Sequence, residues 1–196
     1  MKTRQGRNGW CIAGVLLALV ATGVAAENLA PNSSFEDPPA EGSSFPPHWE
    51  QFSSGQENIM LVSYDKRTGH RCILMKAQKD PNSFKGILFK RPVVAGERYD
   101  FSAWIKNNHR DSMGGTTEGL LVIEWKDAMG EEISRNVSPK WDQTMPRLRW
   151  TRVFLKEMVA PEGAETALFG IHLVEDHLGG RGSYLVDDVE LVLRSR

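Results

Sequence analysis

Short apolar runs recur along the chain from residue 59 onward, and each is rich in Val, Ile, Leu, Phe, Tyr or Trp. Clusters of Gly, Pro, Asn and Asp separate these runs, and no window has the three-to-four-residue spacing of a long amphipathic helix. Evenly spaced strands without intervening helices predict an all-β sandwich or jelly roll. The strands are predicted over residues 59–64, 70–77, 84–91, 97–107, 118–127, 131–137, 148–159, 165–175 and 183–194.

Alternation along a strand assigns its side chains to opposite faces of the sheet. In 99–106 the odd positions are apolar and form the core face, so Trp104 is predicted on the polar face. In 165–175 the same rule places His172 on the face opposite the core. In the last strand Asp187 is predicted to share a face with Leu185, Val189, Leu191 and Leu193. An ionised carboxylate in such surroundings is costly unless it is paired or binds a cation.

The N-terminal segment 1–26 has the three parts of a secretory signal peptide. A cationic start precedes an uncharged apolar stretch over 11–24, and small residues end the segment. A transmembrane anchor is the alternative, but the stretch is shorter than the roughly 20 residues that a spanning helix needs. We therefore expect cleavage after Ala26, a secreted or periplasmic protein, and a single domain over 27–196 with no membrane association after cleavage.

Composition narrows the choice of function. The 24 Lys and Arg residues nearly balance 25 Asp and Glu residues, for a net charge of -1. A nucleic-acid partner requires a concentrated cationic surface and is not expected. The 196 residues are also too few for a typical (β/α)8 barrel, which needs about 250. Cys11 leaves with the signal peptide, so Cys72 has no partner for an internal disulfide and is predicted to be buried and unreactive.

Four blocks of sequence occur in a recognisable order. Residues 28–36 read NLAPNSSFE and precede Trp49, residues 96–106 read GERYDFSAWIK, a WTRVF segment with PEGA follows, and residues 184–191 read YLVDDVEL. Together they resemble carbohydrate-binding modules of the family 4/9 type. The resemblance implies a galactose-binding-domain-like jelly roll of two antiparallel sheets. It also implies a structural Ca²⁺ near the two chain ends.

The calcium ligands are expected among carboxylate and amide side chains, because Ca²⁺ takes six to eight oxygen ligands. Glu36 ends the first block and Asp187 lies in the last, so an ion between them would join the first and last strands. Asn28 and Asp188 are weaker candidates. Alternatively, Glu36 is a loop carboxylate and Asp187 a hydrogen-bonded turn residue.

A sugar site needs an aromatic platform for the apolar C–H faces of the ring, with planar polar side chains beside it. Trp104 is the best platform by its position in the alternation, and Trp49 is placed to border a cleft. Alternatively, Trp104 packs under the loop 107–117 and Trp49 closes the sandwich edge. If the two sheets bend as the family's do, the polar neighbours of Trp104 are Lys106, Asn107, Glu124 and His172.

The function predicted from these features is non-catalytic binding of a polysaccharide or oligosaccharide. A protein-binding module for adhesion or envelope assembly on the same fold is the first alternative, with an envelope or extracellular protein as partner. A small glycoside hydrolase or lyase is less favoured. A glycosidase needs two carboxyl groups facing one cleft, and no motif pairs Glu118, Glu124 and Asp127.

Overall fold

The computed structural model describes residues 26–52, 58–78, 84–175 and 179–194. All of the expected signal peptide except Ala26 lies outside these ranges, so its cleavage stays a prediction. Among the described residues no helix is long and apolar enough to cross a membrane. The described residues form ten strands, namely β1 (Glu50–Phe52), β2 (Ile59–Val62), β3 (Cys72–Lys76), β4 (Phe84–Pro92), β5 (Arg98–Asn107), β6 (Glu118–Lys126), β7 (Glu132–Val137), β8 (Thr151–Val159), β9 (Thr166–Val174) and β10 (Ser183–Arg194).

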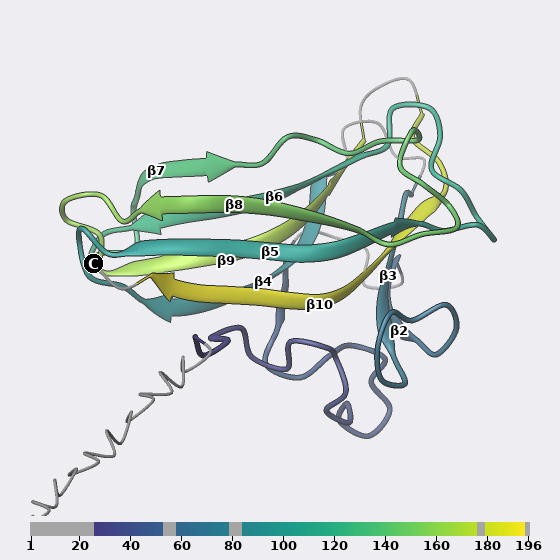
Figure 1. Ribbon diagram of the computed structural model, residues 1–196, viewed down its shortest axis with the longest axis horizontal. Coiled ribbons are helices and arrows are strands. Elements are labelled where there is room, and N and C mark those ends of the chain that lie inside the picture. The colour runs from purple at the N-terminus through teal and green to yellow at the C-terminus, as the bar shows by residue number, and fades with distance from the viewer. Residues whose placement is uncertain (1–25, 53–57, 79–83, 176–178, 195–196) are drawn as a thin grey trace, which may run out of the picture.

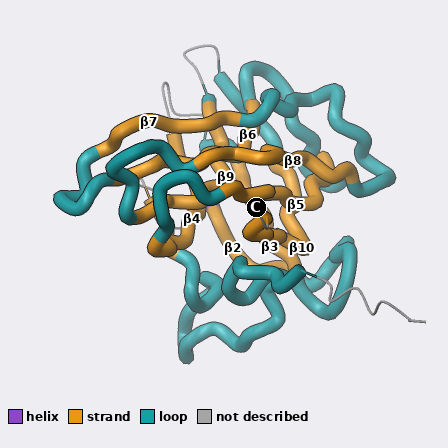
Figure 2. Tube along the Cα trace, turned by 60° about the vertical axis from the view of Figure 1, so that its left-hand side comes forward, coloured by secondary structure: helices purple, strands orange, loops and turns teal. Residues whose placement is uncertain are grey.

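The strands form two five-stranded sheets, which Figure 1 shows as two layers. One sheet has the order β1-β4-β9-β6-β7 and is called here the β9 sheet; the other has the order β2-β3-β10-β5-β8 and is called the β5 sheet. Neighbouring strands pair antiparallel throughout. Loops gather around the two layers (Figure 2). The predicted all-β sandwich of two antiparallel sheets is confirmed.

Each predicted strand is present, with ends shifted by a few residues at most. The strand that the sequence pattern missed is β1, whose three residues are too few to show an alternation. It pairs with the centre of β4, where Phe52 lies opposite Gly86. This short edge strand therefore extends the β9 sheet and brings Phe52 onto it.

The core lies between the sheets and is rich in aromatic side chains. Phe169 of β9 lies at its centre, stacked on Phe89 at 5.3 Å between ring centroids and 5.5 Å from Phe101 of the opposite sheet. Trp125 and Tyr99 close the cluster, 6.1 Å apart. Burying one such side chain stabilises the fold by about 1.5–3 kcal/mol. The alternation predicted for β5 and β9 is confirmed, and it leaves the residues between these core positions on the outer faces.

The predicted face of Asp187 is right for Leu185, two residues before it, and wrong for Val189 and Leu191, because a bulge interrupts β10. The pairing with β5 runs from Asp187 opposite Trp104 directly to Glu190 opposite Ser102, and Asp188 has a positive φ of 42°. An extra residue in one strand reverses the alternation beyond it. Asp187 therefore shares the outer face with Trp104, while Val189 faces the core.

Candidate functional site

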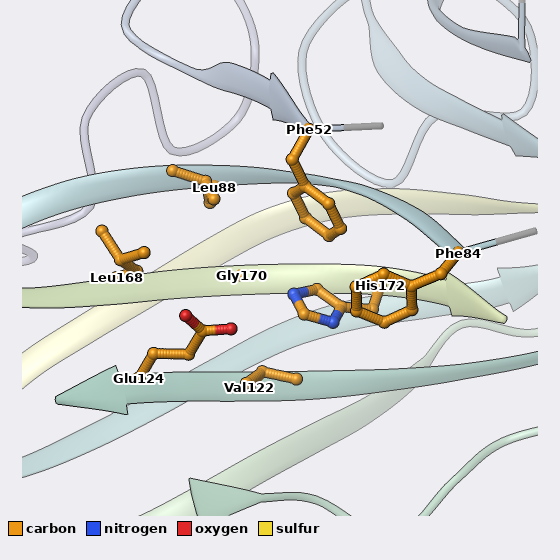
Figure 3. Close-up of a pocket in the computed structure, with 8 residues that line it drawn as sticks. All are labelled: Phe52, Phe84, Leu88, Val122, Glu124, Leu168, Gly170 and His172. Carbon is orange, nitrogen blue, oxygen red and sulfur yellow. The ribbon is translucent and has the colours of Figure 1, made fainter. Parts of the chain in front are cut away.

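A pocket of about 230 Å³ lies on the outer face of the β9 sheet, centred on a glycine. Gly170 of β9 lies between Leu88 of β4 and Val122 of β6 in one cross-strand row. Leu168 and His172 flank it along β9, two residues to either side. Because Gly170 has no side chain, the row is hollow at its centre. The lining residues are Phe52, Phe84, Leu88, Val122, Glu124, Leu168, Gly170 and His172, called here the Gly170 pocket (Figure 3).

Two glycines on adjacent strands allow rings to lie against this sheet. A Cβ on Gly86 would lie 2.5 Å from Cζ of Phe52, so the phenyl ring occupies the space above this glycine. A Cβ on Gly170 would lie 2.6 Å from Nε2 of His172, so the imidazole leans over the pocket floor. Phe52, Gly86 and His172 form one row across β1, β4 and β9. Because these glycines have no side chain, the rings of Phe52 and His172 can lie close to the backbone of the sheet.

Three rings form a wall at one side of the pocket, as Figure 3 shows. Phe52 and Phe84 lie 5.2 Å apart between centroids, and the His172 ring lies 4.5 Å and 4.8 Å from them. His172 is only 3% exposed. Burial lowers the pKa of its imidazole to about 3, and the positive charge of Arg135 adds to this effect. The ring is therefore neutral near pH 7 and can donate or accept one hydrogen bond at each nitrogen according to its tautomer.

Glu124 of β6 provides a carboxylate at the other end of the pocket. Its oxygens lie 3.5 Å from Nζ of Lys126 and 3.7 Å from the guanidinium of Arg135, which is directly opposite on β7. These partly exposed pairs contribute at most about 1 kcal/mol each. Their effect on the site is to orient an acceptor toward the pocket. Glu124 and His172, both predicted from the sequence, are thus brought together.

The structure separates Trp104 from these two residues. Trp104 is on β5, and its outer face lies on the opposite side of the sandwich from the Gly170 pocket. The indole is half-buried, and the guanidinium of Arg67 lies over its ring, 3.8 Å from the centroid. The predicted grouping of Trp104 with Glu124 and His172 fails because bending cannot bring the outer faces of two different sheets together.

Lys106 and Asn107, at the end of β5, are buried and have structural partners. Lys106 forms an ion pair with Asp65 in the turn after β2. The Asn107 side chain donates to the carbonyl oxygens of Gln143 and Met145, each at 3.3 Å, and accepts the N–H of Met113 at 2.9 Å. The loop 107–117 forms bridges to residues 181 and 183, and the pocket lining includes none of its residues.

Trp49 is a core residue. It is 5% exposed, lies 5.4 Å from Phe35 and 5.0 Å from Phe89 between ring centroids, and donates its indole N–H to the carbonyl of Pro31 at 3.1 Å. The residues lining the Gly170 pocket do not include it. These contacts agree with the alternative prediction, that Trp49 closes the edge of the sandwich.

The predicted metal ligands gather around the turn between β2 and β3. Glu36 accepts the backbone N–H groups of His70 and Arg71 on Oε1, both at 2.8 Å. Asp187 accepts those of Arg67 at 2.7 Å and Thr68 at 3.2 Å on Oδ2. Burial raises the pKa of Asp187 to about 6, the backbone donors of the turn opposing this effect.

The other two candidates have different partners. Asp188 binds the side chains of Arg67 and Thr68. Asn28 joins the start of the domain to β10, donating to Val189 and accepting from Leu191, both at 2.9 Å. Among the described residues no three His, Cys, Asp or Glu side chains form a metal-binding group. Two carboxylates approach one turn, so a calcium site here would need carbonyl or amide oxygens as further ligands.

Sequence reasoning missed Phe52, Phe84 and the two glycines of this surface. The available signal was the presence of Gly86 and Gly170 inside predicted strands, where glycine often marks a close approach by another group. Phe52 gave no signal of its own because the pattern did not predict β1.

No protein-family model matches the sequence, and no curated protein matches it significantly. Solved structures of carbohydrate-binding modules are similar in fold. The TmCBM61 structure in complex with β-1,4-galactotriose superposes with a TM-score of 0.56 at 15% identity, over 86% of this chain and 100% of that one. The CBM22-1 xylan-binding domain of Paenibacillus barcinonensis Xyn10C gives a TM-score of 0.60 at 15% identity, over 89% and 99%.

Part of an enzyme also has this fold. The arabinose-bound α-L-arabinofuranosidase MgGH51 gives a TM-score of 0.61 at 12% identity, over 87% of this chain but only 27% of that one. At these identities the likeness concerns the fold alone. The chain therefore has the jelly-roll sandwich fold of carbohydrate-binding modules, and the family 4/9 type is not confirmed.

Proposed function

We propose that this chain binds a polysaccharide or oligosaccharide, without altering it, at the Gly170 pocket. The observation that carries the proposal is the combination of a three-ring wall with two planar polar side chains in one hollow of the β9 sheet. Apolar C–H faces of a sugar pack against aromatic rings, and its hydroxyl groups need directional partners. Phe52 and Phe84 supply the aromatic rings, and Glu124 and His172 supply the hydrogen-bonding groups.

The size of the pocket favours a single sugar ring at its centre. Its volume of about 230 Å³ is below the roughly 300–1,000 Å³ of pockets that enclose a drug-sized ligand. A longer glycan would place one residue in the pocket and extend over the open sheet on either side. TmCBM61 binds galactotriose and the CBM22-1 domain of Xyn10C binds xylan, which supports a glycan as the ligand class.

Binding without hydrolysis is supported by the acid–base groups of the pocket. Glu124 is the only carboxylate among the described residues that line it. A glycosidase needs two carboxyl groups, about 5–9.5 Å apart. The imidazole of His172, with a pKa of about 3, is not a proton donor near neutral pH. A glycoside hydrolase that used this pocket would lack its second carboxyl group.

Two further features belong to the proposal. The segment 1–26 directs export, which places the domain in the periplasm or outside the cell, where polysaccharides are encountered. A Ca²⁺ ion binds between Glu36 and Asp187 and ties the first block of the domain to β10 through the turn 65–71. The ion would stabilise the sandwich at a distance from the Gly170 pocket and take no part in glycan contact.

Phe84 offers the sharpest test. It is 44% exposed in the pocket wall, so Phe84→Ala removes a ring from the site at little cost to folding. Phe154 of β8 is 47% exposed on the opposite sheet and provides the matched control. The chain 27–196 is screened on a glycan array, and hits are measured by isothermal titration calorimetry. We expect Phe84→Ala to weaken binding about tenfold or more and Phe154→Ala to leave it unchanged, since one stacked ring is worth about 1–2 kcal/mol.

Two other outcomes would reject the proposal. Equal loss in both variants would place the ligand elsewhere. Absence of any glycan ligand, together with capture of an extracellular or envelope protein that Phe84→Ala abolishes, would favour the protein-binding alternative. Release of reducing sugar from a bound polysaccharide would contradict the non-catalytic part alone.

A further inference from the structure

The floor of the Gly170 pocket offers a ligand very few hydrogen bonds. Leu88, Val122 and Leu168 surround Gly170 with aliphatic carbon. The backbone of Gly170 lies in the ladders of β9 with both β4 and β6, so its polar groups serve the sheet. A hydroxyl group pressed onto this floor beyond the reach of Nε2 of His172 would lose water without a replacement partner. Such a loss weakens binding on the order of tenfold.

The rings of the aromatic wall do not lie in one plane, so the C–H groups of a sugar pack against one ring at a time. The planes of Phe52 and Phe84 are inclined by 45°, and the His172 ring is inclined to them by 63° and 86°. The three rings therefore form a rough edge beside a hole instead of one platform. The hole lies beside the imidazole edge. A Cβ on Gly170 would lie 2.6 Å from Nε2 of His172, so the ring takes part of the space directly over this glycine, and Leu88, Val122 and Leu168 border the open part.

The polar groups lie around this hole and not beneath it. Glu124 is held at one end by Lys126 and Arg135. His172 is almost fully buried and reaches the pocket only through the Nε2 edge of its imidazole, which provides one polar atom beside the hole. A ligand that fits has a small apolar substituent pointing down and hydroxyl groups pointing outward, toward Glu124 and solvent.

We infer that the Gly170 pocket selects a sugar residue that carries a methyl group, and that this methyl group occupies the hollow beside the His172 imidazole, between Leu88, Val122 and Leu168. The inference rests on the proposed glycan-binding function and adds the substrate class. A methyl group of this kind occurs either as C6 of a 6-deoxyhexose or at the end of an O-acetyl substituent. Burial of one methyl group raises the affinity about fourfold. The affinity rises further because no hydroxyl group is buried without a hydrogen-bond partner.

Matched ligands that differ in one group test the inference. The chain 27–196 is titrated by NMR with the methyl glycosides of 6-deoxygalactose against galactose and of 6-deoxymannose against mannose, each in the D and L series. A second arm compares acetylated xylan with the same xylan after deacetylation, by affinity electrophoresis. We expect the methyl-bearing member of at least one pair to bind about tenfold more tightly. The arm in which the preference occurs identifies the source of the methyl group.

Two variants then locate the preference. Gly170→Ala places a Cβ in the floor, 2.6 Å from Nε2 of His172, and should abolish the preference by filling the hole. Val122→Thr keeps the shape of the wall but adds a hydroxyl group, and should shift the preference toward the hydroxyl-bearing partner. Circular dichroism establishes that both variants fold.

The outcomes separate the inference from the function on which it rests. Equal affinity within every pair, or tighter binding of the hydroxyl-bearing partners, overturns the methyl preference and leaves glycan binding standing. A preference that survives unchanged in Val122→Thr also overturns it, because the methyl group then lies elsewhere. If no glycan of any kind binds, the proposed function fails and the inference fails with it.

Discussion

The guanidinium of Arg67 lies over the indole of Trp104, 3.8 Å from the ring centroid. Asp188 binds the same guanidinium, and Asp187 accepts the backbone N–H groups of Arg67 and Thr68. These contacts join three elements at one point on the β5 sheet, namely the turn after β2, the bulge of β10 and the middle of β5. The ring face that a sugar would need is covered by a side chain of the protein, so Trp104 contributes to stability and not to the Gly170 pocket.

Trp104→Ala is therefore expected to lower the free energy of unfolding and leave glycan binding intact. The lost cation–π contact and the lost burial of a half-buried ring together cost about 1–3 kcal/mol. Urea denaturation measures the change, and glycan affinity should stay within about twofold of the wild type. An affinity loss as large as that of Phe84→Ala would show that Trp104 is part of the glycan-binding site.

Added Ca²⁺ should raise the melting temperature of the chain 27–196, and Glu36→Gln should abolish the rise. An ion that binds only the folded state stabilises it by about 2.7 kcal/mol at a hundred times its dissociation constant. Glu41→Gln, in an exposed loop, is the matched control and should respond to Ca²⁺ as the wild type does. Differential scanning calorimetry with and without EDTA measures the effect, and an unchanged wild-type melting temperature would refute the calcium proposal.

The sequence predicted the fold well because alternation is a local property. In β5 and β9 the apolar positions are regular, and the predicted faces of Phe101, Trp104 and His172 all agree with the structure. The alternation of β10 could not be extended through Asp188, because the positive φ that produces the bulge depends on the turn packed against it. A single extra residue was enough to place Val189 and Leu191 on the face opposite Asp187.

The binding site was harder to predict because it depends on which strands share a sheet. Alternation shows that Trp104 and Glu124 both point away from the core, but β5 and β6 belong to different sheets. Chain order alone does not reveal this separation. The hollow at Gly170 likewise requires its cross-strand neighbours Leu88 and Val122, which come from two other parts of the chain.

Lys85 and Glu175 form a fully buried ion pair, with Nζ 3.3 Å from Oε1, and both side chains are 0% exposed. Removing one charge strands the other, so Lys85→Met is expected to lower the free energy of unfolding by about 3–5 kcal/mol. The double variant with Glu175→Leu should recover most of this loss, because apolar residues of similar volume can replace a buried pair. A double-mutant cycle in urea measures the coupling. Strictly additive single effects would show that the two charges do not stabilise one another.

His172 should make the protein sensitive to acid in a defined range of pH. Its pKa is about 3 in the folded state, against 6.5 for a free imidazole, chiefly because burial disfavours the charged ring. The unfolded chain therefore binds a proton that the folded chain does not, and stability falls as the pH drops from about 6.5 toward 3. The loss from this residue is on the order of 5 kcal/mol. His172→Phe keeps a ring at the site and removes the titration, so its acid-unfolding midpoint should lie at lower pH than that of the wild type.

The exposed His70 provides the control for this experiment, since His70→Phe removes an imidazole that solvent already reaches. Its acid-unfolding curve should follow the wild type, with both measured by intrinsic fluorescence at matched ionic strength. If His172→Phe and the wild type unfold at the same pH, the imidazole of His172 takes up a proton in the folded state as readily as in the unfolded chain, and is charged below about pH 6.5. The three-ring wall would then hold a cation, and the Gly170 pocket would favour an anionic sugar over the neutral, methyl-bearing one.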